Sequence, residues 1–94
     1  MSGFLAKKIV VPDQVLVRMV DDEAVLLNLE TERYFGLDPV GARMWAVLSE
    51  AASVQQALET LLAEYEVDPE TLANDLQALL EKLVEHGLVE ISDA

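Results

Sequence analysis

The sequence contains no cysteine in its 94 residues, which excludes disulfide bonds and thiolate metal sites and favours a reducing cytoplasm. It has no apolar run near the ~20 residues of a membrane span, and its N-terminus lacks the apolar core and cleavage pattern of a signal peptide. Glycine and proline are scarce while 52% of the residues are hydrophobic, a composition typical of a folded chain. We therefore expect one cytoplasmic domain over residues 1–94, with a core from about residue 12 to residue 91.

Basic residues are also few, since 6 lysines and arginines stand against 18 aspartates and glutamates, a formal net charge of −12. Such a charge keeps a protein in solution and opposes its approach to phosphate backbones and anionic lipid. We therefore expect neither nucleic acid nor membrane among its partners.

The groups that catalysis and metal binding need are missing as well. The single histidine, His86, lies near the end of an expected helix, where it suits the helix dipole. The sequence has no HxxxH, CxxC, GxGxxG, GxxxxGK or GxSxG pattern, and its close carboxylate pairs lie in turns and at helix ends. Because nothing places a nucleophile beside a base, we expect no enzyme activity, no catalytic residue, no metal and no cofactor.

The most informative segment covers residues 26–45, LLNLETERYFGLDPVGARMW. Around its start, Val25, Leu27 and Leu29 alternate with the residues between them, the pattern of a strand with one buried face. A short polar turn follows, and residues 33–37, rich in β-formers, predict the next strand.

A further strand is expected before this segment, over residues 14–20, with an acidic reversal after it. Short turns between successive strands predict an antiparallel meander with strand 33–37 at one edge. The two ends of the chain carry weaker patterns. We expect residues 1–8 to be a loose arm, residues 88–91 a short extended tail, and residues 92–94 to be frayed.

Three helices follow the strands. Asp38 and Asp68 are favoured N-caps, each followed by proline, Ser53 begins a capping box, and Gly87 is the usual left-handed terminator. These residues and the apolar periodicity predict helices over residues 39–49, 53–65 and 69–86. Their expected apolar faces are Val40, Met44, Val47 and Leu48, then Val54, Ala57, Leu58, Leu61, Leu62 and Tyr65, then Leu72, Leu76, Leu79, Leu80, Leu83 and Val84. The expected fold is α+β and winged helix-turn-helix-like: a three-stranded antiparallel meander followed by three helices.

A domain of this class often binds DNA with its last helix. Because a fold does not determine a function, the charges on that helix must show whether this chain binds DNA. This helix carries four acidic residues against Lys82 and one histidine. DNA binding needs several cations aimed at phosphates, and we therefore reject it.

The edge of strand 33–37 remains as the candidate surface. Tyr34–Leu37 carries no charge, and unpaired backbone groups at an edge are a template for another strand. Two purely structural explanations compete with a binding role. An edge this short needs no protection against pairing with another strand, and Gly36 is required only by the neighbouring helix. The functional explanation is β-augmentation, in which a peptide adds as a fourth strand against the last helix. About four backbone hydrogen bonds give roughly 2–6 kcal/mol, and micromolar binding needs ~8 kcal/mol, so the peptide is expected to carry spaced apolar anchors.

Three groups of residues resemble a known family. They are Tyr34-Phe35-x-Leu37-Asp38, then Gly41-x-x-Met44-Trp45, and the closing Leu-x-x-Leu with Gly87-Leu88. In this order and spacing, from about Pro12 to Glu90, the sequence resembles the PqqD-like family of recognition elements for the leader peptides of ribosomally synthesised, modified peptides (RiPPs). The stand-alone form is most similar to the leader-binding proteins of lasso peptide biosynthesis.

The resemblance implies that the domain holds a precursor's leader as an extra strand on strand 33–37, against the last helix. It then delivers the leader to a separate leader peptidase, and a macrocyclase acts on the released core peptide. The peptide-binding residues implied in this way are Glu32, Arg33, Tyr34, Phe35, Gly36 and Leu37 on the strand, with Leu72, Asp75, Leu76, Leu79 and Lys82 on the helix. Many relatives have glycine where this chain has Glu32, so a positive φ there would strain Glu32.

Three alternatives stay open at this point. The chain is a PqqD-like chaperone for a radical-SAM maturation enzyme, or an acidic winged-helix regulator, or a homodimer joined through the edge of strand 33–37. A charged residue at Tyr34 or at Leu76 is expected to abolish leader binding without unfolding the protein.

Overall fold

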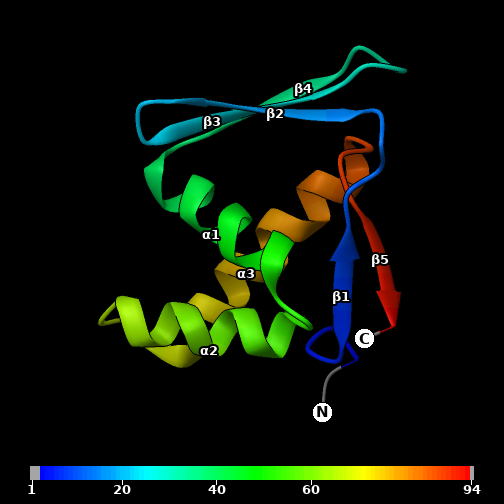
Figure 1. Ribbon diagram of the computed structural model, residues 1–94. Coiled ribbons are helices and arrows are strands. Elements are labelled where there is room, and N and C mark those ends of the chain that lie inside the picture. The colour runs from blue at the N-terminus through cyan, green and yellow to red at the C-terminus, as the bar shows by residue number, and fades with distance from the viewer. Residues whose placement is uncertain (1–2, 94) are drawn as a thin grey trace.

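The computed structural model describes residues 3–93, and a three-stranded antiparallel sheet with three helices on one side of it forms its centre (Figure 1). The strands are β2 (Val15–Val20), β3 (Glu23–Asn28) and β4 (Tyr34–Leu37), hydrogen-bonded in the order β2-β3-β4. The helices are α1 (Pro39–Glu50), α2 (Val54–Glu64) and α3 (Pro69–Glu85). This architecture confirms the expected α+β fold, a three-stranded meander followed by three helices.

The helices begin and end at the residues that the sequence marks. The side chains of Asp38, Ser53 and Asp68 each accept a hydrogen bond from the backbone N–H three residues on, at 2.8, 3.1 and 3.1 Å. These bonds satisfy amides that have no partner inside the helix. After α3, Gly87 adopts a φ of 72°, and this left-handed residue ends the helix.

The helices cover the face of the sheet that carries Ala24, Leu26 and Asn28, and all three residues are buried. The sequence pattern pointed to Val25 and Leu29, with Leu27, as the apolar face of this strand. That face is turned away from the helices, and Val25 and Leu29 are 38% and 53% exposed. The alternation is correct, but both faces of β3 carry apolar residues, so the alternation does not tell which of them is covered.

The core below the sheet is built from all three helices. Its fully buried large side chains include Leu26 of the sheet, Leu61 of α2, and Leu76 and Leu83 of α3. On α1 the predicted face is wrong at its start, because Val40 is 49% exposed. The buried face of α1 is instead Ala42, Met44, Trp45, Val47 and Leu48, so Trp45 is a core residue.

Both ends of the described chain join in a second, two-stranded sheet, and the expectation of a loose arm and a frayed tail is wrong for them. β1 (Lys7–Val10) pairs antiparallel with β5 (Glu90–Asp93), with Ile9 opposite Ile91. Just before β1, Leu5 O accepts a hydrogen bond from Gln55 N of α2 at 3.0 Å, which holds this part of the chain to the helices. Residues 1, 2 and 94 lie outside the described part of the chain.

An ion pair closes the open end of this ribbon, where Lys7 Nζ donates to Asp93 Oδ1. The hydrogen bond and the charge of Lys7 hold the pKa of the Asp93 carboxyl below its ordinary value. A lowered carboxyl pKa means that the pair stabilises the fold above the ordinary pKa of aspartate, and that this contribution is lost as the pH falls through the lowered value.

We therefore expect Lys7→Met to raise the pKa of Asp93 towards its ordinary value. The same variant should have a lower melting temperature than the unaltered protein at neutral pH. At acid pH the two melting temperatures should be equal, because Asp93 is protonated in both proteins. Carboxyl NMR titration and thermal unfolding at two pH values measure these effects. Lys8→Met is the matched control, because Lys8 is exposed and pairs across the ribbon with Ser92. An Asp93 pKa that does not move would contradict the pairing.

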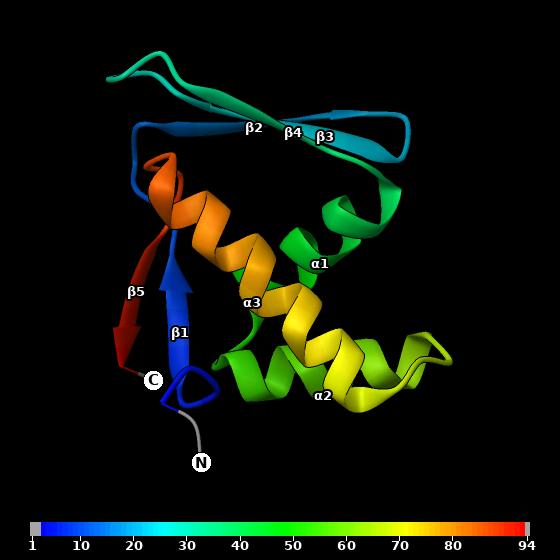
Figure 2. The ribbon, with the colours of Figure 1, turned by 180° about the vertical axis from the view of Figure 1, so that it is seen from behind.

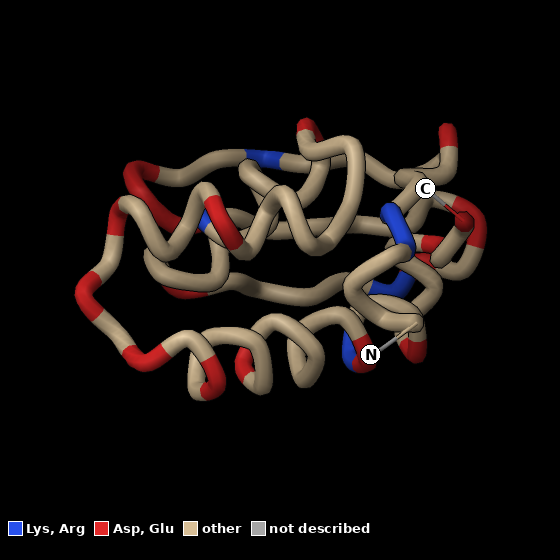
Figure 3. The backbone as a smooth tube through the Cα atoms, turned by 90° about the horizontal axis from the view of Figure 1, so that it is seen from below, with Lys and Arg blue, Asp and Glu red and all other residues tan. Residues whose placement is uncertain are grey.

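Acidic residues are spread over the turns and helices, and the few basic residues are scattered between them (Figure 3). No helix within residues 3–93 is long and apolar enough to cross a membrane.

Candidate peptide-binding site

β4 lies at one edge of the three-stranded sheet, and no other strand within residues 3–93 pairs with its far side. Two hydrogen bonds at the turn end of the sheet fix which way the backbone groups point. Asn28 N donates to Arg33 O at 2.8 Å, and the next residue, Leu29, donates to Gln14 O at 2.8 Å. Successive residues of the middle strand therefore bond alternately to its two neighbours, as an antiparallel sheet requires.

The same alternation identifies the backbone groups at the free edge of β4. Phe35 lies opposite Leu26, two residues before Asn28 and therefore turned towards β4. Phe35 and Leu37 thus use their N–H and C=O groups in bonds to β3. Tyr34 and Gly36 direct theirs away from the sheet. The free edge offers these two N–H and two C=O groups to an added strand.

Asn28 fixes the turn after β3 to the end of α3. Its Nδ2 donates to Gly87 O at 2.7 Å, while its Oδ1 accepts from Glu30 N at 2.9 Å and from Thr31 N at 3.2 Å. The side chain is 3% exposed, and these bonds satisfy both ends of a buried amide. The alternating pattern predicts Asn28 only as an ordinary strand residue and does not reveal this role. An asparagine directly before a turn is a signal for such bonding.

Glu32 occupies the strained position that its departure from the family pattern suggested. Its φ is 63°, in the left-handed region that glycine adopts without strain. The backbone is held there because Glu32 N donates to Asn28 O at 2.7 Å.

One flank of α3 faces β4, and we call it the β4 flank. The ring centroids of Phe35 and His86 lie 5.1 Å apart, and His86 Nδ1 lies 2.8 Å from Lys82 O. Leu79 and Asp75 continue this flank on the preceding turns, because residues three and four apart share a face. Leu79 is half-buried, and Asp75 and Lys82 are exposed. Figure 2 shows α3 crossing in front of α1 and α2, with its C-terminal end reaching the sheet.

The remaining predicted site residues divide between surface and core. Glu32, Arg33, Tyr34 and Gly36 are exposed, with Tyr34 at 71%. The other three, Leu37, Leu72 and Leu76, are 5%, 4% and 0% exposed and belong to the hydrophobic core. The expectation that Leu76 tolerates a charge is therefore wrong, because a carboxylate there would lie among buried leucines.

Gly36 is not required by a neighbouring helix. A Cβ built at this position meets no atom within 4 Å, so the space beside it is open. The structural explanation based on close packing is therefore wrong, and the described chain gives no packing reason for the glycine.

The candidate site combines the outward backbone groups of Tyr34 and Gly36 with the half-buried Leu79 and the opposite charges of Asp75 and Lys82. Within residues 3–93, no group of three or more histidine, cysteine, aspartate or glutamate side chains is placed to hold a metal ion.

Comparisons with known proteins identify the family of this chain. The family model described as Coenzyme PQQ synthesis protein D (PqqD) matches residues 23–89. A solved structure of TbiB1 in complex with the TbiA(beta) leader peptide is 41% identical, covers 85% of this chain and 93% of its own, and superposes with a TM-score of 0.79. A structure of lasso peptide synthetase B1 complexed with the leader peptide is 25% identical, covers 88% of this chain and 98% of its own, and has a TM-score of 0.78.

No curated protein sequence matches the chain. The family model nevertheless spans the three-stranded sheet from the start of β3, all three helices and the turn after α3. Together with the 41% identity to a structure that covers most of both chains, this match shows that the chain belongs to the PqqD family.

Proposed function

We propose that this protein binds the leader segment of a ribosomally synthesised precursor peptide, as a fourth strand on the edge of β4 and against the β4 flank of α3. It delivers the leader to a separate leader peptidase, ahead of macrocyclisation in lasso peptide biosynthesis. One observation carries this proposal: the unpaired edge of β4 lies beside α3 in a fold whose two matched structures are both leader-peptide complexes.

The backbone of β4 supplies affinity without sequence preference. The outward N–H and C=O groups of Tyr34 and Gly36 allow about four hydrogen bonds, worth roughly 2–6 kcal/mol in total. A micromolar complex needs about 8 kcal/mol, and ordering a flexible peptide adds to that requirement. Side chains of the leader must therefore contribute as well.

The β4 flank of α3 provides the contacts that select a sequence. Leu79 is half-buried beside the exposed Asp75 and Lys82, so an apolar leader residue packs on it between two opposite charges. One or two such residues, at about 1.5–3 kcal/mol each, close the gap to micromolar binding. Arg33 and Glu32, exposed at the start of β4, add polar contacts to the neighbouring end of the leader.

The protein acts in this proposal as a carrier without catalytic residues or a cofactor, in the cytoplasm where precursor peptides are made. The leader peptidase supplies the chemistry. A homodimer joined through the β4 edge would use the same backbone groups, so we expect leader and second copy to exclude each other.

A second candidate function is favoured by the family model, whose description refers to coenzyme PQQ synthesis. In that case the same edge holds a precursor peptide for a radical-SAM maturation enzyme. The two functions differ in the precursor peptide that is bound and in the enzyme that acts on it. The enzyme encoded beside this protein therefore distinguishes them.

The test is a titration of ¹⁵N-labelled protein with the leader encoded beside it. We expect a dissociation constant in the micromolar range or below, with amide shifts concentrated in residues 33–37 and on the β4 flank of α3. A peptide with the same composition in scrambled order is the control. Failure of every local leader to bind would overturn the carrier function, and shifts confined to other faces would overturn the proposed site.

A further inference from the structure

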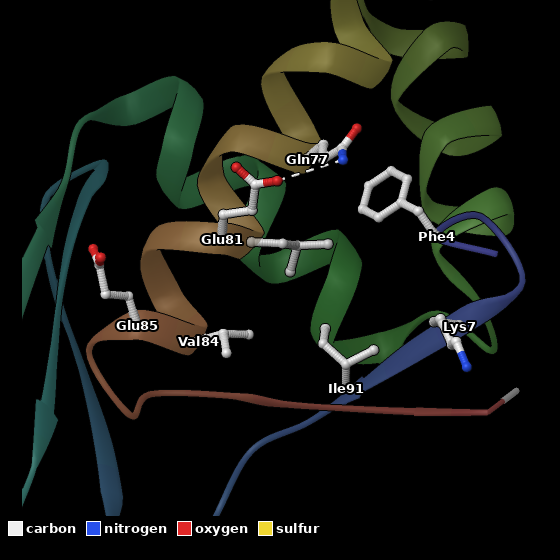
Figure 4. Close-up of a pocket in the computed structure, with 8 residues that line it drawn as sticks. Phe4, Lys7, Gln77, Glu81, Val84, Glu85 and Ile91 are labelled. Atoms are coloured by element: carbon white, nitrogen blue, oxygen red, sulfur yellow. Dashed lines mark hydrogen bonds between the residues drawn. The ribbon is translucent and has the colours of Figure 1, made fainter. Parts of the chain in front are cut away.

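A cavity lies on the side of α3 away from β4, between that helix and the β1–β5 ribbon (Figure 4). Its volume is about 380 Å³. It is lined by Phe4, Lys7, Gln77, Leu80, Glu81, Val84, Glu85 and Ile91. The proposed leader site uses none of these residues, and we call this cavity the α3–β5 pocket.

The position of this pocket follows from the helical repeat. Gln77, Glu81 and Val84 share one flank of α3, whereas Lys82 and Leu79 lie on the β4 flank. The buried face of α3, with Leu76 and Leu83, lies between the two flanks. A ligand in the α3–β5 pocket and a leader on β4 would therefore contact opposite sides of the same helix.

The walls of the pocket are apolar and partly open to solvent. Leu80, 2% exposed, forms the floor, while Val84 and Ile91 are 44% and 42% exposed. Figure 4 shows both side chains pointing into the space that Phe4 bounds on the far side. Ligand sites for small molecules measure roughly 300–1,000 Å³. This pocket is at the small end of that range, which suits an anchoring side chain better than a large cofactor.

The rim of the pocket is acidic. Glu81 and Glu85 are exposed and lie one helical turn apart, where two like charges repel each other. Neither has an ion-pair partner within residues 3–93, and the nearby Lys7 is paired with Asp93. Glu81 accepts one hydrogen bond, from Gln77 Nε2 at 3.4 Å. A basic group at this rim would remove the repulsion and complement the charge.

We propose that the α3–β5 pocket docks a segment of a partner protein in which an apolar side chain is flanked by lysine or arginine. The apolar side chain fills the space between Val84 and Ile91, and the basic residues pair with Glu81 and Glu85. An apolar anchor in a pocket with complementary charges at the rim is the arrangement that gives protein interfaces both affinity and orientation. This inference does not depend on leader binding, but the geometry lets both ligands be held at once.

The probe is a short amphipathic peptide of leucine and lysine, titrated into the full chain with ¹³C-labelled methyl groups at physiological salt. Screening at this salt limits long-range attraction to about 8 Å, so the general acidity of the protein contributes little. We expect the methyl signals of Ile91, Val84 and Leu80 to shift, and those of Val40, which is exposed on the first turn of α1, to stay. Adding the leader should leave the affinity for the probe within about twofold.

Matched charge variants test whether the acidic rim, Glu81 and Glu85, contributes to binding of the probe. The double variant Glu81→Gln with Glu85→Gln should weaken probe binding roughly three- to tenfold. The double variant Glu59→Gln with Glu66→Gln removes the same charge from α2 and the loop after it, and should change binding less than twofold. Equal weakening by both pairs, or the absence of Ile91 shifts, would overturn the pocket as a docking site. Displacement of the probe by the leader would overturn simultaneous binding.

Discussion

Leu76→Asp is expected to unfold the protein at neutral pH. Leu76 is 0% exposed at the centre of α3. Removing a buried leucine side chain costs about 2–5 kcal/mol, and a carboxylate left unpaired in the core costs several kcal/mol more. Because domains of this size have about 5–15 kcal/mol of stability, the two losses together remove most or all of it. Circular dichroism during urea unfolding measures the result.

Two companion variants separate a core effect from a general effect of the substitution. Leu76→Ala should remain folded in water but unfold at a lower urea concentration. Val40→Asp places the same charge on the exposed first turn of α1, where a carboxylate suits the helix dipole, and should keep its stability. A Leu76→Asp protein as stable as the unaltered chain would contradict the position of α3. Loss of leader binding in this variant says nothing about the β4 flank of α3, and a charge at Leu79 is the better test.

The parts of the fold that the sequence predicts well are those fixed by neighbouring residues. The three aspartate and serine caps bond to amides three residues on, and Gly87 ends α3 through its own backbone angle. The order of the strands follows from short turns, which leave β4 at an edge. Each of these features depends on a few consecutive residues, so the local sequence is enough to predict it.

The pairing of β1 with β5 depends on residues at opposite ends of the chain. Lys7 lies opposite Asp93, and the four-residue strands carry little pattern of their own. The strands pair because the chain leaves α3 beside the end of β1, with Glu90 opposite Val10, and no local sequence signal indicates this. The face of β3 that is buried is set in the same way, since Leu26 and Leu27 are equivalent until the helices cover one of them.

The residues of the candidate site on β4 could be predicted from the sequence, and those on α3 less fully. Tyr34 and Gly36 follow from the edge position of β4, whereas Glu32 is implied only by the family resemblance. On α3 the family resemblance implies Leu72 and Leu76 together with Asp75, Leu79 and Lys82, but Leu72 and Leu76 are buried in the core. The β4 flank is marked instead by contacts that only the folded chain creates, between Phe35 and His86 and between Asn28 and Gly87.

Gly36→Pro is expected to weaken leader binding roughly tenfold or more while the free protein stays folded. Proline has no N–H, and the N–H of Gly36 points to the free edge, so no bond to β3 is lost. One backbone hydrogen bond is worth about 0.5–1.5 kcal/mol, and the proline ring also stands where the added strand must approach. Calorimetric titration with the leader measures the affinity, and amide spectra of β3 report whether the sheet is intact.

Gly36→Ala is the control that separates the amide from the space around it. Alanine keeps the N–H, and its Cβ meets no atom within 4 Å, so binding should stay within about threefold of the unaltered protein. If alanine weakened binding as much as proline does, the open space beside Gly36 would be what the ligand needs, and backbone pairing at this residue would be wrong. If neither variant changed the affinity, the leader would bind without the β4 edge. A charge at Leu79 would then show whether it binds on α3 alone, because Leu79 lies on the β4 flank and has no part in the sheet.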